Sequence, residues 1–347
     1  MKRMVRWGAV ALLGLAACGG GGGSGGDGDG TASGDDDDDL PGTHSTEPWS
    51  EVETSQAAGC CAQVKKSLPF VDGNLDPGKY EYAIPDDPIG LVVVFHGSSS
   101  SVAAVQQTEW IELYNVLWAR GIGVAMANST DRDSKKWSEE SAASNVDVDM
   151  IDEMLGRLSE DTDWDLGDPL VTVGFSNGAK FSALFAEAGQ QRGRDVKGAV
   201  MHQGGNLLIG GGIPGLWVSA ENDDGGGGPS AMERNAADQG NGSLHLAGTE
   251  VALHPNRFAK LAAHDEESSA RLFDTLVEKG WIDSDGWRIF EFDGDPDDHA
   301  DRLENQLDIG NSATDVMVQL RVTWAIHRMS AQNKVAEAEW IEEQLLR

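Results

Sequence analysis

The segment Gly174-Phe175-Ser176-Asn177-Gly178 limits the folds open to this chain, because it joins two stretches of different character. Residues 170–173 before it form a short apolar run, as in a strand buried on both faces. Residues 179–188 after it have the pattern of a helix. A strand that turns at once into a helix strains the central serine, and the flanking glycines make room for that turn. The segment therefore predicts that Ser176 is exposed at the end of a strand, facing the positive end of the next helix.

Strand-like and helix-like stretches alternate through most of the remaining chain. Short apolar or alternating runs predict strands, and longer stretches with apolar residues three or four apart predict helices. The expected strands are residues 80–85, 91–95, 121–127, 196–201 and 216–219, and the expected helices are residues 105–120 and 146–158. This alternation favours an α/β fold, a mostly parallel sheet with helices on both faces and its chemistry at the carboxyl ends of the strands.

Residues 1–17 have the pattern of a secretory signal peptide. Lys2, Arg3 and Arg6 precede an apolar run that is too short to span a bilayer permanently. The run ends in Leu15-Ala16-Ala17-Cys18, which resembles the lipobox of bacterial lipoproteins and implies that Cys18 carries the lipid. Since Gly19 rather than Asp follows, we expect an outer-membrane or cell-surface location, with the membrane as a partner. The alternative is an ordinary secretory signal with a chance cysteine.

Residues 18–49 are predicted to be a disordered tether. They consist mainly of Gly, Ser, Asp and Thr, including an Asp run at 35–39, and cannot bury apolar surface. A calcium site is disfavoured because a plain Asp run lacks the turn geometry of calcium loops. The rest of the chain, residues 50–347, is long enough for one large α/β domain.

The chain is strongly acidic, with a formal net charge of −32. Nucleic acid is therefore not expected as a partner, because contacts to phosphate need Lys and Arg. Cys60 and Cys61 are adjacent, and outside the cytoplasm they either pair with each other in a strained ring or stay reduced. Two neighbouring thiols without a nearby His do not surround a metal ion, so we expect a structural role for them.

Three segments resemble the α/β-hydrolase superfamily, and within it secreted esterases similar to polyhydroxybutyrate depolymerases and feruloyl esterases. They are residues 80–85, residues 91–98 and residues 174–179, and by order of elements the resemblance covers roughly residues 75–220. The resemblance implies a serine hydrolase that acts on carboxylic esters, with its groups in the order Ser, acid, His along the chain. Such chemistry requires no metal or organic cofactor.

Acyl transfer needs donors directed at the position of the oxyanion. One expected donor is the backbone N–H of Asn177, directly after the nucleophile. The resemblance implies that the other is the N–H of Ser98, in the loop that follows His96 and Gly97. We expect His96 itself to hold that loop by a side-chain hydrogen bond.

The acid is expected a few residues after the strand at 216–219. Asp223 best matches the position, and Asp224 and Glu221 are near alternatives. In so acidic a chain these residues also fit a solvated loop.

Two histidines compete for the role of general base. His327 stands before the last helix, where the superfamily normally carries its base, and His299 follows residues 287–292, which fit a last strand. Residues 316–326 alternate like a strand but also fit a helix, because Ser312 and Asp315 have capping-box spacing. The remaining candidates look like surface histidines of an insertion: His245, His254 and His264.

The distance along the chain from Asp223 to His327 is larger than a minimal hydrolase needs. We expect a cap insertion at about residues 225–285, with a glycine hinge at 225–228 and two helices within residues 254–282. Such a cap would shape the substrate pocket. Two competing hypotheses are a non-catalytic surface binding protein on a hydrolase scaffold and a peptidase of the same fold.

Overall fold

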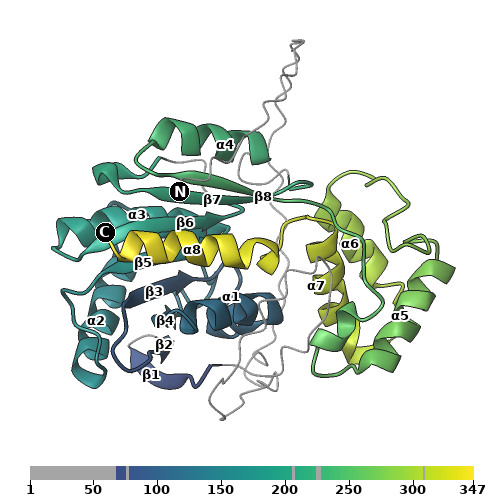
Figure 1. Ribbon diagram of the computed structural model, residues 1–347, viewed down its shortest axis with the longest axis horizontal. Coiled ribbons are helices and arrows are strands. Elements are labelled where there is room, and N and C mark those ends of the chain that lie inside the picture. Colours follow the sequence, from purple (N-terminus) through teal and green to yellow (C-terminus); the bar gives the residue numbers. More distant parts are fainter. Residues whose placement is uncertain (1–67, 76–77, 205–207, 224–227, 308) are drawn as a thin grey trace, which may run out of the picture. The chain divides into compact units, whose positions relative to one another are not determined.

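The computed structural model describes residues 68–75, 78–204, 208–223, 228–307 and 309–347 (Figure 1). The predicted signal peptide, the tether, the two adjacent cysteines and Asp224 lie outside these residues. Within them, no helix is both long enough and apolar enough to cross a membrane.

The centre of the described part is a sheet in the order β1-β2-β4-β3-β5-β6-β7-β8. The β1–β2 and β2–β4 pairs are antiparallel, and all the other neighbouring strands are parallel. The strands are β1 (Val71–Leu75), β2 (Gly78–Ala83), β3 (Gly90–Phe95), β4 (Ile122–Ala127), β5 (Leu170–Phe175), β6 (Val196–His202), β7 (Gly215–Ala220) and β8 (Leu244–Gly248). The predicted α/β fold with a mostly parallel sheet is confirmed.

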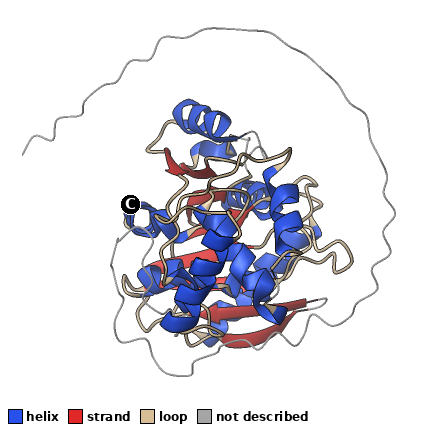
Figure 2. Cartoon of the chain, turned by 90° about the vertical axis from the view of Figure 1, so that its right-hand side faces the viewer, coloured by secondary structure: helices blue, strands red, loops and turns tan. Residues whose placement is uncertain are grey.

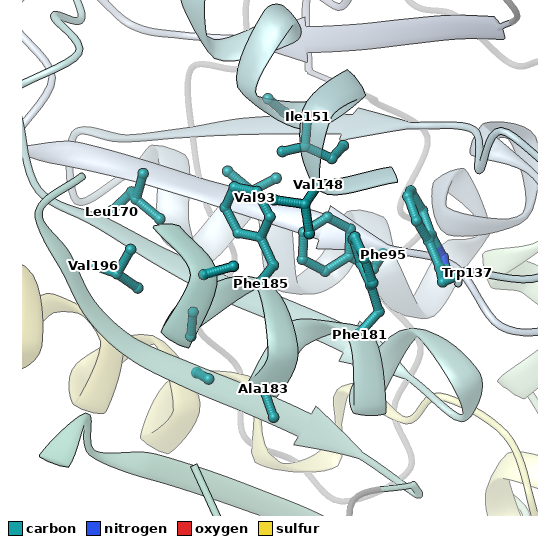
Figure 3. Packing of buried hydrophobic residues seen from close by; sticks show 14 of the residues in the cluster. Val93, Phe95, Trp137, Val148, Ile151, Leu170, Phe181, Ala183, Phe185 and Val196 are labelled. Atoms are coloured by element: carbon teal, nitrogen blue, oxygen red, sulfur yellow. The ribbon is translucent and has the colours of Figure 1, made fainter. Parts of the chain in front are cut away.

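Helices cover both faces of this sheet because its central strands are apolar on both sides. Along β3, alternate residues belong to different cores: Val93 and Phe95 contribute to one core, and Val92 and Val94 to the other. The first core packs against α2 (Val146–Asp161), α3 (Asn177–Gln191) and α4 (Gly228–Gln239), and the second against α1 (Thr108–Trp118) and α8 (Lys334–Leu345). Figure 3 shows part of the first core, with Phe181 and Phe185 of α3 beside strand residues.

A separate helical insertion follows β8. It contains the short 3₁₀ helix Arg257–Lys260 and the helices α5 (Glu266–Glu278), α6 (Pro296–Glu304) and α7 (Ala313–Thr323). Its buried apolar residues form a core of their own, from Leu253 to Ile326. Figure 2, turned so that the right-hand side of Figure 1 faces the viewer, shows helices in front of the strands.

The boundaries expected for this cap, about 225–285, differ from those observed. Met232 and Ala236 of α4 belong to a core of the sheet, and β8 pairs with β7, so residues 228–248 complete the sheet. The cap instead occupies residues 253–326 and ends directly before His327.

Two local predictions in this region were wrong. Residues 287–292 do not form a last strand, since only a single bridge between Ile282 and Arg288 occurs there. The last strand is β8, in a stretch expected to be part of the insertion. Of the two interpretations of residues 316–326, the helix is confirmed up to Thr323, the last residue of α7, and the apolar residues of the segment pack into the cap core.

Candidate active site

Ser176 occupies a strained turn between β5 and α3. Its φ of 55° and ψ of −117° lie in a region that L-residues rarely adopt, and such strain is typical of functional sites. A Cβ atom at Gly174 would overlap the backbone of Gly178, and one at Gly178 would overlap the carbonyl oxygens of Phe95 and His96. Both flanking glycines are therefore required by close backbone approach, as the segment predicts.

The loop after β3 lies directly against the start of α3. The carbonyl oxygens of Phe95 and His96 approach Gly178, and the ring of Phe175 lies close to Gly97. Ser98 and Asn177, the two expected oxyanion donors, thus belong to adjoining segments at the carboxyl ends of neighbouring parallel strands. Asn177 is the first residue of α3, where backbone N–H groups are free of helical partners.

His96 holds the loop after β3 as a neutral imidazole. Its Nε2 accepts a hydrogen bond from the backbone N–H of Ser129 at 3.2 Å, so its Nδ1 carries the proton and donates to the carbonyl of Gly97 at 2.7 Å. Burial lowers the pKa of His96 to about 4, which keeps the ring uncharged at neutral pH. The expected loop-holding hydrogen bond is present.

Trp137 joins this loop to the turn at Ser176, a contact that the sequence did not predict. Its indole N–H donates to the carbonyl of His96 at 2.9 Å, and its backbone N–H donates to Oδ1 of Asn177 at 2.8 Å. The indole also stacks on Phe181, with ring centroids 4.6 Å apart, and lies next to Phe95 (Figure 3). The only signal in the sequence was a Trp within the otherwise polar loop after β4. A single Trp has no spacing relative to other residues that would indicate its role.

The structure brings Asp223 and His327 together. Asp223 stands three residues after β7, and His327 lies in the segment between α7 and α8. The Nδ1 of His327 donates to Oδ2 of Asp223 at 3.0 Å, which leaves Nε2 as the acceptor. The Asp223 carboxylate is buried, the imidazole is partly exposed, and the imidazole contacts the ring of Phe175, next to Ser176, with centroids 4.9 Å apart.

The alternative acid and base lie in other surroundings. Glu221 is exposed and accepts a hydrogen bond from the backbone N–H of Glu250. His299 belongs to α6, where its ring stacks on Phe290 at 4.7 Å and its Nδ1 accepts from the N–H of Asp293. These contacts place His299 inside the cap.

The three histidines expected at the surface are each half-buried. His245 lies in β8 and hydrogen-bonds the hydroxyl of Ser219 at 2.8 Å, and burial lowers its pKa. Burial also lowers the pKa of His264, and the Nδ1 of His254 accepts from the N–H of Asn256. The expectation failed because β8 and the start of the cap were not recognised as packed structure.

A buried ionic cluster connects the cap to α1 and to the chain after His327. Glu109 of α1 accepts from the guanidinium of Arg257 and from the backbone N–H of Ala331, each at 2.9 Å. Lys260 and Lys334 both donate to Glu112, each at 2.5 Å. Burial would raise the pKa of Glu109, but Arg257 and Lys260 lower it to about 2, so the carboxylate stays charged.

Among the residues described, no group of three or more His, Cys, Asp or Glu side chains is arranged to hold a metal ion. The sequence matches no protein-family model and no curated protein.

Several solved structures of low sequence identity are similar to this chain. One is a hyperthermophilic esterase from the archaeon Pyrobaculum calidifontis, 15% identical over 60% of this chain and 85% of that one, with a TM-score of 0.41. Another is an α/β serine hydrolase without a lid from Xanthomonas campestris, 13% identical over 60% and 94% of the two chains, with a TM-score of 0.38. A third is an α/β serine hydrolase homologue from Coxiella burnetii, 12% identical over 59% and 97%, with a TM-score of 0.38.

The chain's own geometry defines its architecture. The sheet begins with antiparallel strands and continues with parallel ones. A strained serine lies between β5 and α3, at the carboxyl edge of this sheet. An acid after β7 and a histidine before the last helix follow in chain order. The protein has the α/β-hydrolase fold.

Proposed function

We propose that this protein is a serine hydrolase that cleaves carboxylic esters through an acyl-enzyme intermediate. The observation that carries the proposal is the hydrogen bond between His327 and Asp223, formed beside the strained turn of Ser176. A strained serine turn with a histidine oriented by a buried carboxylate is the arrangement that nucleophilic catalysis needs.

The mechanism has two steps. Nε2 of His327 takes the proton of the Ser176 hydroxyl as its oxygen attacks the ester carbonyl, and the imidazolium then gives that proton to the departing alcohol. The N–H groups of Asn177 and Ser98 stabilise the oxyanion in both steps. Water, deprotonated by the same imidazole, attacks the acyl-enzyme and releases the carboxylic acid, and the imidazolium returns its proton to the oxygen of Ser176. Asp223 fixes the tautomer of His327 and stabilises the imidazolium.

Esters are preferred to peptides as substrates on the basis of the sequence resemblance at residues 80–85, 91–98 and 174–179. The competing hypotheses remain a peptidase of the same fold and a non-catalytic binding protein. The strained turn argues against the binding protein, because a serine held at positive φ costs about 1–3 kcal/mol and has little structural use.

We further propose that a lipid on Cys18 anchors the enzyme at the outer membrane or cell surface, with residues 18–49 as a spacer. The supporting observation is the ending Leu15-Ala16-Ala17-Cys18 after a charged and apolar leader. Replacing Cys18 by Ser should move the protein from the membrane fraction to the soluble fraction.

The activity is tested by measuring hydrolysis of short-chain nitrophenyl esters by the purified protein. Ser176→Ala and His327→Ala should each lower kcat by about 10⁴-fold or more, whereas His299→Ala should keep the parent's activity. Cleavage of aminoacyl amides but not of esters would favour the peptidase. No turnover of either class by the parent would favour the binding protein.

A further inference from the structure

We propose that Gln203 is a positioning residue that holds His327 in place, an inference that rests on the proposed function. Gln203 directly follows β6, and its Nε2 donates to the backbone carbonyl of Arg328 at 2.6 Å. Arg328 is the residue after His327. The side-chain amide of Gln203 therefore fixes the backbone on the carboxyl side of the general base.

Gln203 is itself fixed against the nucleophile turn. The carbonyl of His202, the residue before it, accepts the backbone N–H of Ser176 at 2.9 Å. Gly204, the residue after it, approaches the backbone of Ser176 so closely that a Cβ atom there would overlap it. Gln203 thus connects the segment that touches Ser176 to the segment that carries His327.

The backbone of Gln203 is held in a conformation that a non-glycine residue rarely adopts. Its φ is 48°, and its N–H donates to the carbonyl of Val218 in β7 at 2.8 Å. The residue is only 4% exposed, so its side chain is shielded from solvent. Within the described part of the chain, its Oε1 is buried and makes no hydrogen bond, which leaves the donor to Arg328 as the anchoring contact.

A second amide holds the other side of the same loop. The side chain of Asn222 donates to the carbonyl of Trp324 at 2.7 Å, and its backbone N–H donates to that of Ala325 at 2.9 Å. His327 is therefore held on its amino side from the end of β7, through Asn222, and on its carboxyl side from the end of β6, through Gln203. Losing either anchor frees one end of a short loop whose imidazole must stay directed at Ser176.

The test is Gln203→Met, which keeps the length of the side chain and removes the donor. We expect kcat for nitrophenyl esters to fall about 10- to 100-fold with KM and the thermal midpoint little changed, because a small misplacement of a catalytic group has effects of this size. The matched control is Gln239→Met. Gln239 in α4 also donates to backbone carbonyls, those of Ile209 and Ile213. These two residues precede β7 and lie outside the segment that carries His327, so the loss of Gln239 should leave kcat unchanged.

The same substitution in a His327→Ala background separates positioning from a general structural role. A residue that acts through His327 should cause no further loss of the residual activity once the imidazole is gone. An equal loss in both backgrounds, or no loss in the parent background, would overturn the proposal while leaving the esterase intact. Inactivity of the parent would overturn both proposals. If Gln203→Met does not fold, Gln203→Asn, which keeps the amide but draws it back by one methylene, takes its place with the same expected results.

Discussion

The Nδ1 of His327 lies 3.0 Å from Oδ2 of Asp223, although the two residues are 104 positions apart in the chain. Most of the intervening residues belong to α4 and β8, which complete the sheet, and to the cap, which ends directly before His327. The carboxylate is buried and the imidazole is partly exposed, so the carboxylate is shielded from solvent while the imidazole remains accessible.

The pairing predicts a large effect of Asp223→Asn. An amide at this position can donate to Nδ1 and so favour the tautomer that carries its proton on Nε2, which cannot accept the proton of Ser176. We expect kcat to fall by about 10⁴-fold at neutral pH with the fold intact. Glu221→Gln is the control, because Glu221 is exposed and its side chain accepts a hydrogen bond from the backbone N–H of Glu250, away from His327. Equal activities of the two variants would contradict the assignment of the acid.

Gly178→Ala should damage both stability and activity. The new Cβ would overlap the carbonyl oxygens of Phe95 and His96, which belong to β3 and its following loop and cannot move aside cheaply. We expect a loss of about 3 kcal/mol or more in the free energy of unfolding, measured by denaturant titration. Gly156→Ala in α2 meets no atom within 4 Å and should instead stabilise the protein by about 0.5–1 kcal/mol.

Glu109→Gln tests the ionic cluster that joins the cap to α1. Removing the charge leaves Arg257 buried without its counterion, and we expect a loss of about 3–5 kcal/mol in the free energy of unfolding. In contrast, Glu267→Gln removes an exposed pair with Arg271 on α5 and should cost less than about 1 kcal/mol. Similar losses in the two variants would show that the buried pair does not anchor the cap.

His96 should make stability depend on pH in the weakly acidic range. The unfolded chain binds a proton at His96 near the ordinary pKa of 6.5, whereas the folded chain binds it only near a pKa of about 4. Stability is therefore lost as the pH falls from about 6.5 towards 4, by roughly 2–3 kcal/mol from this group. Urea unfolding at pH 7 and pH 4.5 should show a smaller pH-dependent loss for His96→Gln than for the parent. The same loss in both proteins would contradict the burial of a neutral imidazole.

The central sheet could be predicted from the sequence because its signal is local. A strand that is buried on both faces, such as β3, must be apolar along its whole length, as Val92 and Val93 illustrate. The serine turn adds a fixed spacing of glycines. The edge strand β8 gave no such signal, since its residues are partly exposed and mix polar with apolar side chains. Because β8 was not recognised, the cap was expected at about residues 225–285, earlier in the chain than the observed residues 253–326.

The choice between His327 and His299 could not be made from local patterns. Residues 287–292 fit a last strand in the sequence, but Phe290 packs on Trp324 and His299 within the cap. Among the described residues, the segment forms only one bridge, between Arg288 and Ile282. The pairing of His327 with Asp223 depends on how the whole cap folds back. Trp137, Gln203 and Asn222 were missed for the same reason, because their contacts are long-range hydrogen bonds to backbone atoms.

The most direct measurement is to identify the residue that a fluorophosphonate modifies. Such a probe reacts with a serine activated as a nucleophile, and mass spectrometry of a digest locates the adduct. We predict a single adduct on Ser176, formed rapidly in the parent and far more slowly in His327→Ala. Absence of an adduct at Ser176, or equally fast labelling in His327→Ala, would contradict this prediction.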